Sequence, residues 1–297
     1  RTGGTFRSRP DVSTPSRYGR DSARHDRRSA ALIRGGFTLI ELLVVISVVM
    51  LLLALLLPSL QKARRQAKTV LCQANLRQWG SVMALYTDDN EGRLPVLSGG
   101  TVLWFFRGSW LPPGDPNRPQ VFQKVVTRGI ACCPMAVKIR PGPTTGRSSG
   151  RGPYGSYEIR WASGSTFQAW KITSPPPPFR GSYGFNVTAF PKSIDSFLSR
   201  GNANVPIILD SPNRMGRHRN TDPPPRREND GFQTFCINRH NGYINSLFLD
   251  WSARRVGLKE LWTLKWDDES VTTGPWTKAG GVLPEDWPYW MRGFKDY

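Results

Sequence analysis

The stretch that decides the fold is FTLIELLVVISVVMLLLALLL, residues 37–57, in which 21 residues carry a single charged side chain, Glu41. A helix rises ~1.5 Å per residue, so a helix of this length spans the ~30 Å hydrocarbon core of a bilayer. No other segment of the sequence is as apolar. A cleaved secretory signal has a shorter apolar region of ~7–15 residues. The stretch therefore predicts a transmembrane helix.

Residues 1–36, which precede this stretch, are strongly basic. They hold nine arginines against three aspartates and few apolar residues. A segment of this composition cannot bury a core, so we expect a disordered leader. Basic residues are about as frequent on the other flank of the apolar stretch, so the positive-inside rule does not orient the helix.

The whole chain has 297 residues, enough for about two domains of ~150 residues each. Its formal charge of +19 suits an anionic partner such as nucleic acid or a lipid surface. The 29 glycines and 25 prolines predict long loops. Four cysteines are too few for a small scaffold built on disulfides.

Glu41 is the unusual residue of the apolar stretch. An acidic side chain at this depth costs ~2.5–3.5 kcal/mol on insertion scales, so it needs a partner. Gly35 and Gly36 precede Phe37, and a cut after Gly36 would place a new α-amino group one helical turn from the carboxylate. The two charges would then neutralise each other, within one subunit or between neighbours.

The motif GGFTLIELLVV, residues 35–45, behind a basic leader resembles the class III signal of type IV pilins and type II secretion pseudopilins. The resemblance implies that a prepilin peptidase removes residues 1–36 by cutting after Gly36 and N-methylates Phe37. It implies a structural subunit and no enzyme. The subunit would assemble through its helix and Glu41 into a short filament for type II protein secretion.

The same resemblance implies the location and the partners of the chain. We expect a single-pass protein of the inner membrane, with a cytoplasmic N-terminus before processing and a periplasmic head. The implied partners are prepilin peptidase, other pilin or pseudopilin subunits, the inner-membrane assembly platform and membrane lipid.

The helix is expected to continue beyond the apolar stretch. Pro58 ends or kinks the apolar run, and pilin-like helices commonly carry a proline here. Residues 58–92 then form an amphipathic continuation, with Gly92 as its stop. Their helical stripe at spacings of four and three consists of Cys72, Leu76, Trp79, Met83 and Tyr86. One helix of about 50 residues would lie half in the membrane or filament core and half on a head domain.

Residues 93–266 predict a β-rich head with long loops, followed by an aromatic-rich tail at 267–297. The expected class is α+β and pilin-like, with the long N-terminal helix packed on a small antiparallel sheet. Residues 140–180 and 211–230 are rich in Gly, Pro and Arg and predict solvated loops. The candidate strands are Val102–Phe106, Tyr183–Asn186, Pro206–Asp210, Ile244–Leu249 and Ala253–Leu258.

The segment RHNGYINSLFLDW, residues 239–251, places nine residues between His240 and Asp250. It is similar to the H-x9-DG signature of pilin-processing-associated proteins of planctomycete-like bacteria, with Trp251 in place of the glycine. We expect Asp250, Trp251 and Ser252 to turn the chain between two strands, and His240 to hydrogen-bond Asp250 across the hairpin base. A His–Asp pair also suits catalysis, but no nucleophile with a local signature accompanies it, which favours a structural role.

The cysteines allow more than one arrangement. Disulfides persist outside the cytoplasm, and a bridge between the adjacent Cys132 and Cys133 is strained. Two complete pairings then remain, Cys72–Cys133 with Cys132–Cys236 or the exchanged set. The resemblance favours Cys72–Cys133, and four buried free thiols are the alternative.

Two other functions stay open. A minor pilin that captures DNA or surfaces would suit the charge of +13 that remains after removal of the leader. A membrane-tethered enzyme would use His240 and Asp250. No cofactor is predicted, although Asp210 and Asp250 offer oxygen ligands for calcium.

Overall fold

The computed structural model describes residues 37–92, 94, 129–144, 146–152, 155–174, 178–190, 202–228, 235–267 and 269–297. The predicted leader at 1–36, Gly36 and the predicted strand Val102–Phe106 lie outside these residues. The chain divides into two units, Arg1–Leu53 and Ala54–Tyr297, and each is described by itself.

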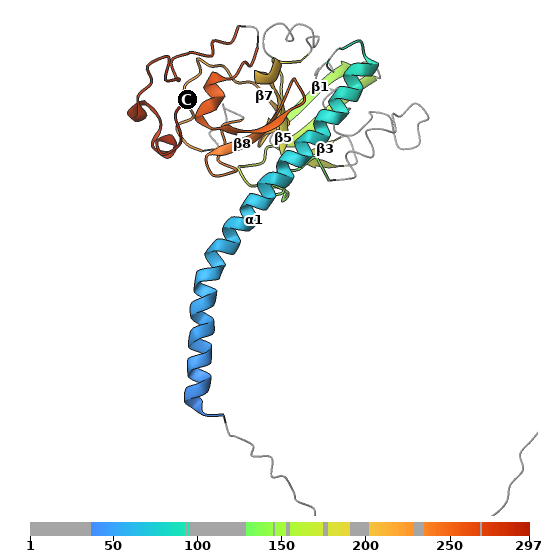
Figure 1. Cartoon of the computed structure of the whole chain (residues 1–297). Coiled ribbons are helices and arrows are strands. Elements are labelled where there is room, and N and C mark those ends of the chain that lie inside the picture. Colours follow the sequence, from blue (N-terminus) through green and yellow to red (C-terminus); the bar gives the residue numbers. More distant parts are fainter. Residues whose placement is uncertain are drawn as a thin grey trace, which may run out of the picture. The chain divides into compact units, whose positions relative to one another are not determined.

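A single helix, α1, covers Leu39–Asp89, which confirms the prediction of one helix of about 50 residues (Figure 1). Pro58 lies inside it, and the helix continues through this position without a break. At its C-terminal end the backbone N–H of Gly92 donates to the carbonyl of Thr87 at 2.8 Å, and Gly92 has a φ of 74°. Glycine adopts this left-handed conformation without strain, so Gly92 ends the helix as predicted.

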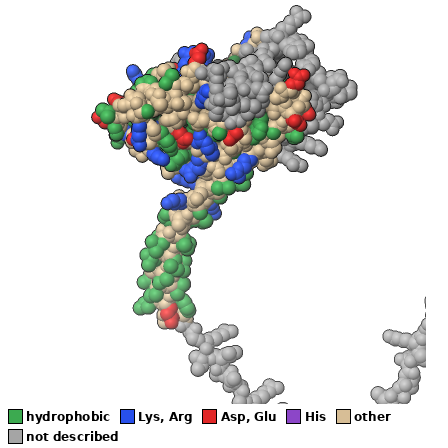
Figure 2. Space-filling model, turned by 45° about the horizontal axis from the view of Figure 1, so that its top comes forward, with side chains coloured by type: hydrophobic (Ala, Val, Ile, Leu, Met, Phe, Trp, Pro, Cys, Tyr) green, Lys and Arg blue, Asp and Glu red, His purple; other side chains and the backbone are tan. Residues whose placement is uncertain are grey.

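The apolar first part of α1 is exposed along its whole length. Every residue from Leu39 to Leu57 is exposed, and Figure 2 shows hydrophobic side chains covering this part of the helix. The helix is long and apolar enough to cross a membrane by length and composition. These residues therefore contribute nothing to the core of the single chain.

The second part of α1 packs on the head. Of the predicted stripe, Cys72, Leu76, Trp79 and Met83 are buried and Tyr86 is partly buried, so the predicted contact face is confirmed. The helix also approaches closely at Gly80, where a Cβ would lie 3.0 Å from the side chain of Leu247 and 3.1 Å from the backbone oxygen of Trp251.

The first sheet of the head is antiparallel, with the strand order β1-β2-β3-β4. Its strands are β1 (Gly146–Gly152), β2 (Gly155–Ala162), β3 (Trp170–Ser174) and β4 (Phe179–Gly181). The prediction of loops over residues 140–180 is therefore wrong for most of this region. The reason is visible at Gly146 and Gly181: an added Cβ would lie 2.2 Å from the ring of Trp161 and 2.4 Å from the ring of Trp170. At these two positions glycine lets a strand pair with its neighbour beside a large tryptophan ring, and it does not mark a turn.

The second sheet has the strand order β7-β5-β6-β8-β9. Its strands are β5 (Tyr183–Asn186), β6 (Pro206–Asp210), β7 (Met215–Gly216), β8 (Tyr243–Phe248) and β9 (Ala253–Gly257). Four of these match predicted strands to within one residue at each end. Strands β5 and β7 are parallel and the other pairs are antiparallel. The α+β class is confirmed, but the described residues of the head form two sheets, one of them mixed, instead of one small antiparallel sheet.

The five-stranded sheet is covered on both faces. Tyr183, Phe185 and Leu247 pack with the buried stripe of α1 in one cluster. Ile244 and Phe248 face the opposite way, as alternation along a strand requires, and belong to a second cluster. The rest of that second cluster comes from the C-terminal part of the chain, including Trp262, Trp266, Trp287 and Met291.

The C-terminal part is built from short 3-10 helices, η2 (Lys259–Thr263), η3 (Pro284–Asp286) and η4 (Tyr289–Met291); a further one, η1 (Asn202–Asn204), precedes β6. Trp287 and Met291 belong to the region predicted as a tail and are almost fully buried. Residues 267–297 therefore form part of the head.

Residues 211–230 were expected to form a solvated loop. Apart from β7, the described residues 211–228 are irregular and many of them are exposed, but the segment is not solvated throughout. His218 and Asn220 are almost fully buried. The side-chain amide of Asn220 donates to the carbonyls of Trp262, at 2.6 Å, and Leu264, at 2.9 Å. The basic residues of the segment favour a solvent-exposed loop, but His218 and Asn220 pack against Trp262 and its neighbours in the second cluster.

Candidate functional site

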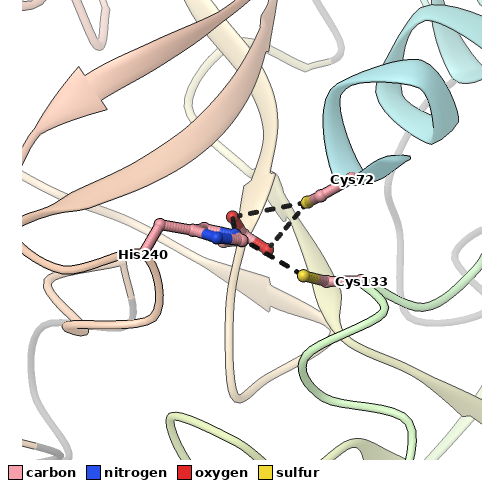
Figure 3. A group of neighbouring side chains, drawn as sticks. Cys72, Cys133 and His240 are labelled. Atoms are coloured by element: carbon pink, nitrogen blue, oxygen red, sulfur yellow. Dashed lines mark hydrogen bonds and ion pairs between the residues drawn. The ribbon is translucent and has the colours of Figure 1, made fainter. Parts of the chain in front are cut away.

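Four buried side chains that can bind metals meet inside the head: Cys72, Cys133, Asp210 and His240. One ligand atom from each lies within 4.8 Å of every other. In Figure 3, Cys72 on the helix, Cys133 on a loop and His240 point toward one another. These four residues come from segments that are far apart in the sequence, so only the folded chain brings them together.

Local structure fixes each of the four. Cys72 is the first fully buried residue of α1. The backbone N–H of Cys133 donates to Ser182 Oγ at 2.5 Å. Asp210 ends β6, and its Oδ2 accepts from the backbone N–H of Asn245 at 2.8 Å.

His240 lies in a tight turn before β8. Its backbone N–H donates to the carbonyl of Tyr243 at 3.0 Å. Asn241 and Gly242 both have positive φ, 57° and 88°. The turn directs the imidazole of His240 into the head, where the side chain is buried.

The contacts inside the cluster are short. Cys72 Sγ lies 3.6 Å from Asp210 Oδ1 and 3.7 Å from Oδ2. His240 Nε2 lies 3.1 Å from Asp210 Oδ2 and 3.5 Å from Cys133 Sγ. Asp210 therefore contacts one thiol and the imidazole, and the imidazole contacts the other thiol.

Arg239 compensates the charge of the buried carboxylate. Its Nη1 donates to Asp210 Oδ1 at 2.9 Å and to the carbonyl of Ser182 at 2.6 Å. Its Nε donates to the carbonyl of Thr166 at 2.6 Å. Both charged side chains are fully buried, and a buried ion pair of this kind requires hydrogen bonds to both partners to offset the cost of desolvation.

Burial and mutual contacts set the ionisation of the cluster. Burial alone would raise the pKa of Asp210, but the charges of His240 and Arg239 lower it to about 2. Burial alone would lower the pKa of His240, but the Asp210 carboxylate raises it to about 9. Burial raises the pKa of the Cys72 thiol well above its usual value. Burial also raises the pKa of the Cys133 thiol, but its hydrogen bonds with Cys72 and His240 outweigh this effect and lower the pKa. Of the two thiols, Cys133 therefore ionises at the lower pH.

An outer set of polar groups orients these side chains. His240 Nδ1 lies 3.0 Å from Thr69 Oγ1, and that hydroxyl donates its own hydrogen to the carbonyl of Arg65 at 3.1 Å. The hydroxyl of Tyr183 donates to Cys72 Sγ at 3.2 Å. Since the hydroxyl hydrogen of Thr69 is used on Arg65, Thr69 Oγ1 is placed to accept from Nδ1–H, and Nε2 is the ring nitrogen that faces Asp210 and Cys133.

The predicted disulfide between Cys72 and Cys133 is not formed in the structure. All four cysteines, each of which is described, are free thiols. The structure nevertheless brings Cys72 and Cys133 into one cluster, as the prediction required, while Cys236 lies apart in the second core cluster.

The predicted hydrogen bond between His240 and Asp250 is wrong. Both residues are described, and they lie beyond opposite ends of β8. Asp250 is exposed, and its Oδ1 accepts from the backbone N–H and the hydroxyl of Ser252 at 3.0 and 2.7 Å. The predicted turn between the two strands is confirmed, and Trp251 occupies it with a φ of 65°, a conformation that favours glycine.

The two aspartates named as possible calcium ligands, Asp210 and Asp250, lie apart. Asp210 is fully buried at the far end of the β6–β8 pair from Asp250. Its neighbours are two sulfur atoms and an imidazole, whereas calcium takes six to eight oxygen ligands. The two aspartates do not form a common site.

The processing residues lie at the start of α1. Gly36 falls outside the described residues, and Phe37 is exposed. Glu41 Oε2 accepts from the backbone N–H and the hydroxyl of Thr38, both at 2.8 Å, and the backbone N–H of Glu41 donates to Thr38 Oγ1 at 3.2 Å. This reciprocal arrangement is a capping box.

Sequence reasoning missed several of these residues. The spacing Thr-x-x-Glu at 38–41 is a capping-box signature and could have revealed Thr38. Arg239, Thr69 and Tyr183 carry no local pattern that marks them as partners of the cluster. Their roles depend on contacts between distant parts of the chain.

Comparisons of the chain with protein-family models, with curated proteins and with solved structures found no match in any of the three.

Proposed function

We propose that this chain is a pilin-like or pseudopilin subunit that a prepilin peptidase cleaves after Gly36 and N-methylates at Phe37. The processed subunit assembles through its N-terminal helix into a short filament, in the service of type II protein secretion. The head domain lies outside the cytoplasm and the apolar part of α1 in the inner membrane before assembly.

The observation that carries the proposal is the uncovered apolar half of α1. Residues 39–57 are all exposed, and none of the apolar window is buried inside the chain. Apolar surface in water costs about 25 cal/mol per Å², so this helix needs a bilayer or the helices of other copies around it. A subunit that passes from membrane to filament provides both surroundings in turn.

Glu41 supports assembly over a plain membrane anchor. Both bonds from Thr38 are accepted by Oε2. Oε1 is then the oxygen on which the amine of a processed Phe37, from the same or a neighbouring subunit, would bind. The capping box occupies Oε2 only, and a negative charge at this depth is costly unless an amine neutralises it.

Processing and assembly are tested together on membrane-extracted protein. We expect the mature chain to begin with N-methylated Phe37 by N-terminal sequencing and intact mass. A mature chain that keeps residues 1–36, or that begins after residue 57, would refute the proposal.

Two matched variants separate charge from capping in assembly. Glu41→Gln keeps a capping side chain but cannot neutralise an amine, so cross-linked oligomers should fall by about tenfold or more while membrane insertion stays intact. Thr38→Ala removes the capping box and keeps the charge, so it should still assemble. Normal oligomers from Glu41→Gln would contradict the assembly role of Glu41.

A further inference from the structure

We propose that Cys72, Cys133, Asp210 and His240 form a closed structural site for a single zinc-class transition-metal ion, which fastens α1 to the head. The proposal does not depend on the function proposed above. It rests on the ligand types, on the spacing of their atoms, on the groups that orient them and on the charge of the site.

The ligand types select the metal. Two thiolates, one imidazole and one carboxylate make a mixed sulfur, nitrogen and oxygen set with four members. Zinc is bound by these three donor types, and four protein ligands with no open position are typical of its structural sites. Magnesium and calcium prefer oxygen ligands throughout, so this set disfavours them.

The spacing of the ligand atoms fits tetrahedral coordination. Bonds of ~2.0–2.3 Å at tetrahedral angles place neighbouring ligand atoms about 3.3–3.8 Å apart. The contacts of 3.6 Å between Cys72 Sγ and Asp210 Oδ1 and of 3.5 Å between Cys133 Sγ and His240 Nε2 fall in this range. The contact of 3.1 Å between His240 Nε2 and Asp210 Oδ2 is slightly shorter. Since no pair exceeds 4.8 Å, adjustments of about 1 Å close the site.

Three of the four ligands are oriented from behind. Metal-bound histidines usually donate their second ring N–H to an oxygen, and His240 Nδ1 lies 3.0 Å from Thr69 Oγ1. Arg239 and the backbone N–H of Asn245 hold the Asp210 carboxylate. The hydroxyl of Tyr183 donates to Cys72 Sγ.

The charge balances when the ion is bound. Two thiolates and one carboxylate carry three negative charges, which a divalent ion and the fully buried Arg239 neutralise. Binding of the ion releases to solvent the thiol protons of Cys72 and Cys133 and the Nε2 proton of the His240 imidazolium, and no oxidant or reductant takes part. A neutral site is the form that a buried location tolerates best.

The four ligands also explain why the site would be structural. Cys72 belongs to α1, Cys133 to the loop before β1, Asp210 to the end of β6 and His240 to the turn before β8. One ion would therefore connect the helix to the five-stranded sheet. The ligands are 0–5 % exposed, which leaves no room for a substrate.

Metal titration of the full-length chain tests the proposal. The chain, purified in detergent, reduced and stripped with a chelator, should bind one equivalent of Zn²⁺ and gain thermal stability. Co²⁺ in its place should give the visible bands of a tetrahedral site and a near-ultraviolet thiolate charge-transfer band. If the stripped chain bound neither Zn²⁺ nor Co²⁺ on titration, the proposal would be overturned. A Cys72–Cys133 disulfide, found by peptide mapping of the protein as isolated, would also overturn it.

Matched variants identify the ligands. Cys133→Ser should weaken Zn²⁺ binding by about 100-fold or more and reduce the charge-transfer band, whereas Cys132→Ser, at the neighbouring residue, should leave both unchanged. Thr69→Val keeps shape and removes the outer oxygen, so it should weaken binding about 10–100-fold with the bands retained. If Cys133→Ser misfolds, the Thr69→Val variant and the wild-type Co²⁺ spectrum still test the proposal, because neither requires Cys133→Ser to fold. An unchanged Co²⁺ spectrum in folded Cys133→Ser would contradict the assignment.

Discussion

The two halves of α1 are one continuous helix with opposite surroundings. Residues 39–57 are exposed on every side, whereas the half that follows buries a stripe that begins at Cys72 and ends at Thr87. The first half is apolar all round and the second is apolar on one face only. The second half has its partner inside the chain, and the first half needs a partner from outside.

The difference shows that the two halves of one helix depend on different contacts. The packed half is held by side chains of the head, including the hydrogen bond from Trp79 Nε1 to the carbonyl of Ile130 at 3.0 Å. The uncovered half has no such contacts and would be held by its own backbone hydrogen bonds in lipid. Substitutions in the two halves should therefore affect different properties.

The largest effect on stability is expected at Trp79. Trp79→Ala should lower the free energy of unfolding of the head by about 3–5 kcal/mol, because it empties a fully buried position and leaves the Ile130 carbonyl without its indole donor. Denaturant unfolding followed by circular dichroism measures the change. Leu51→Ala, in the uncovered half, is the control and should change head stability by less than about 0.5 kcal/mol. Equal losses in the two variants would erase the distinction between the halves.

Acid should loosen the head while it spares the uncovered half. Burial lowers the pKa of His218 from 6.5 to about 3, and the ring lies between Trp262 and Trp266, with centroids 4.8 and 4.7 Å away. Its two ring nitrogens have no hydrogen-bond partner among the described residues. Below pH 6.5 His218 is therefore protonated in the unfolded chain, whereas it stays neutral in the folded head. Stability is complete above that pH and falls as the pH decreases toward 3.

At pH 5 this loss amounts to about 2 kcal/mol, from ~1.36 kcal/mol per pH unit. His218→Leu stays buried and cannot titrate, so it should remove that part of the acid sensitivity. Denaturant midpoints of both proteins at pH 7 and pH 5 measure it, and the helical signal of the apolar half in detergent should persist. Identical pH dependence of the two proteins would show that His218 is not the sensitive group.

The sequence predicted those parts of the fold that local pattern encodes. Both halves of α1, its end at Gly92 and strands β5, β6, β8 and β9 follow from apolar runs and stops. Strands β1–β4 were missed, and β1, GRSSGRG, has no alternation of apolar and polar residues that could have revealed it. Its pairing with β2 is decided by neighbours that only the folded chain supplies.

The candidate site was predicted residue by residue but not as a unit. Cys72 and Cys133 were expected to form a disulfide and His240 to contact Asp250, and Asp210 was named only as a possible calcium ligand. The structure gathers four of these five residues into one cluster and leaves Asp250 in the β8–β9 turn. Spacing along a chain does not encode which distant residues meet, so the grouping needed the tertiary structure.

Water accessibility of α1 in membranes tests the central claim most directly. Leu51 and Leu85 are about equally exposed in the single chain, 63 % and 60 %, so the chain itself gives them the same access to water. We expect Leu85→Cys to react with a water-soluble maleimide in permeabilised membranes and Leu51→Cys to stay unlabelled until the membranes are dissolved and the chain is denatured. Wild-type protein, with its four buried cysteines, provides the blank. Equal labelling of the two variants in intact bilayers would show that the apolar half of α1 lies in water, and it would contradict the account.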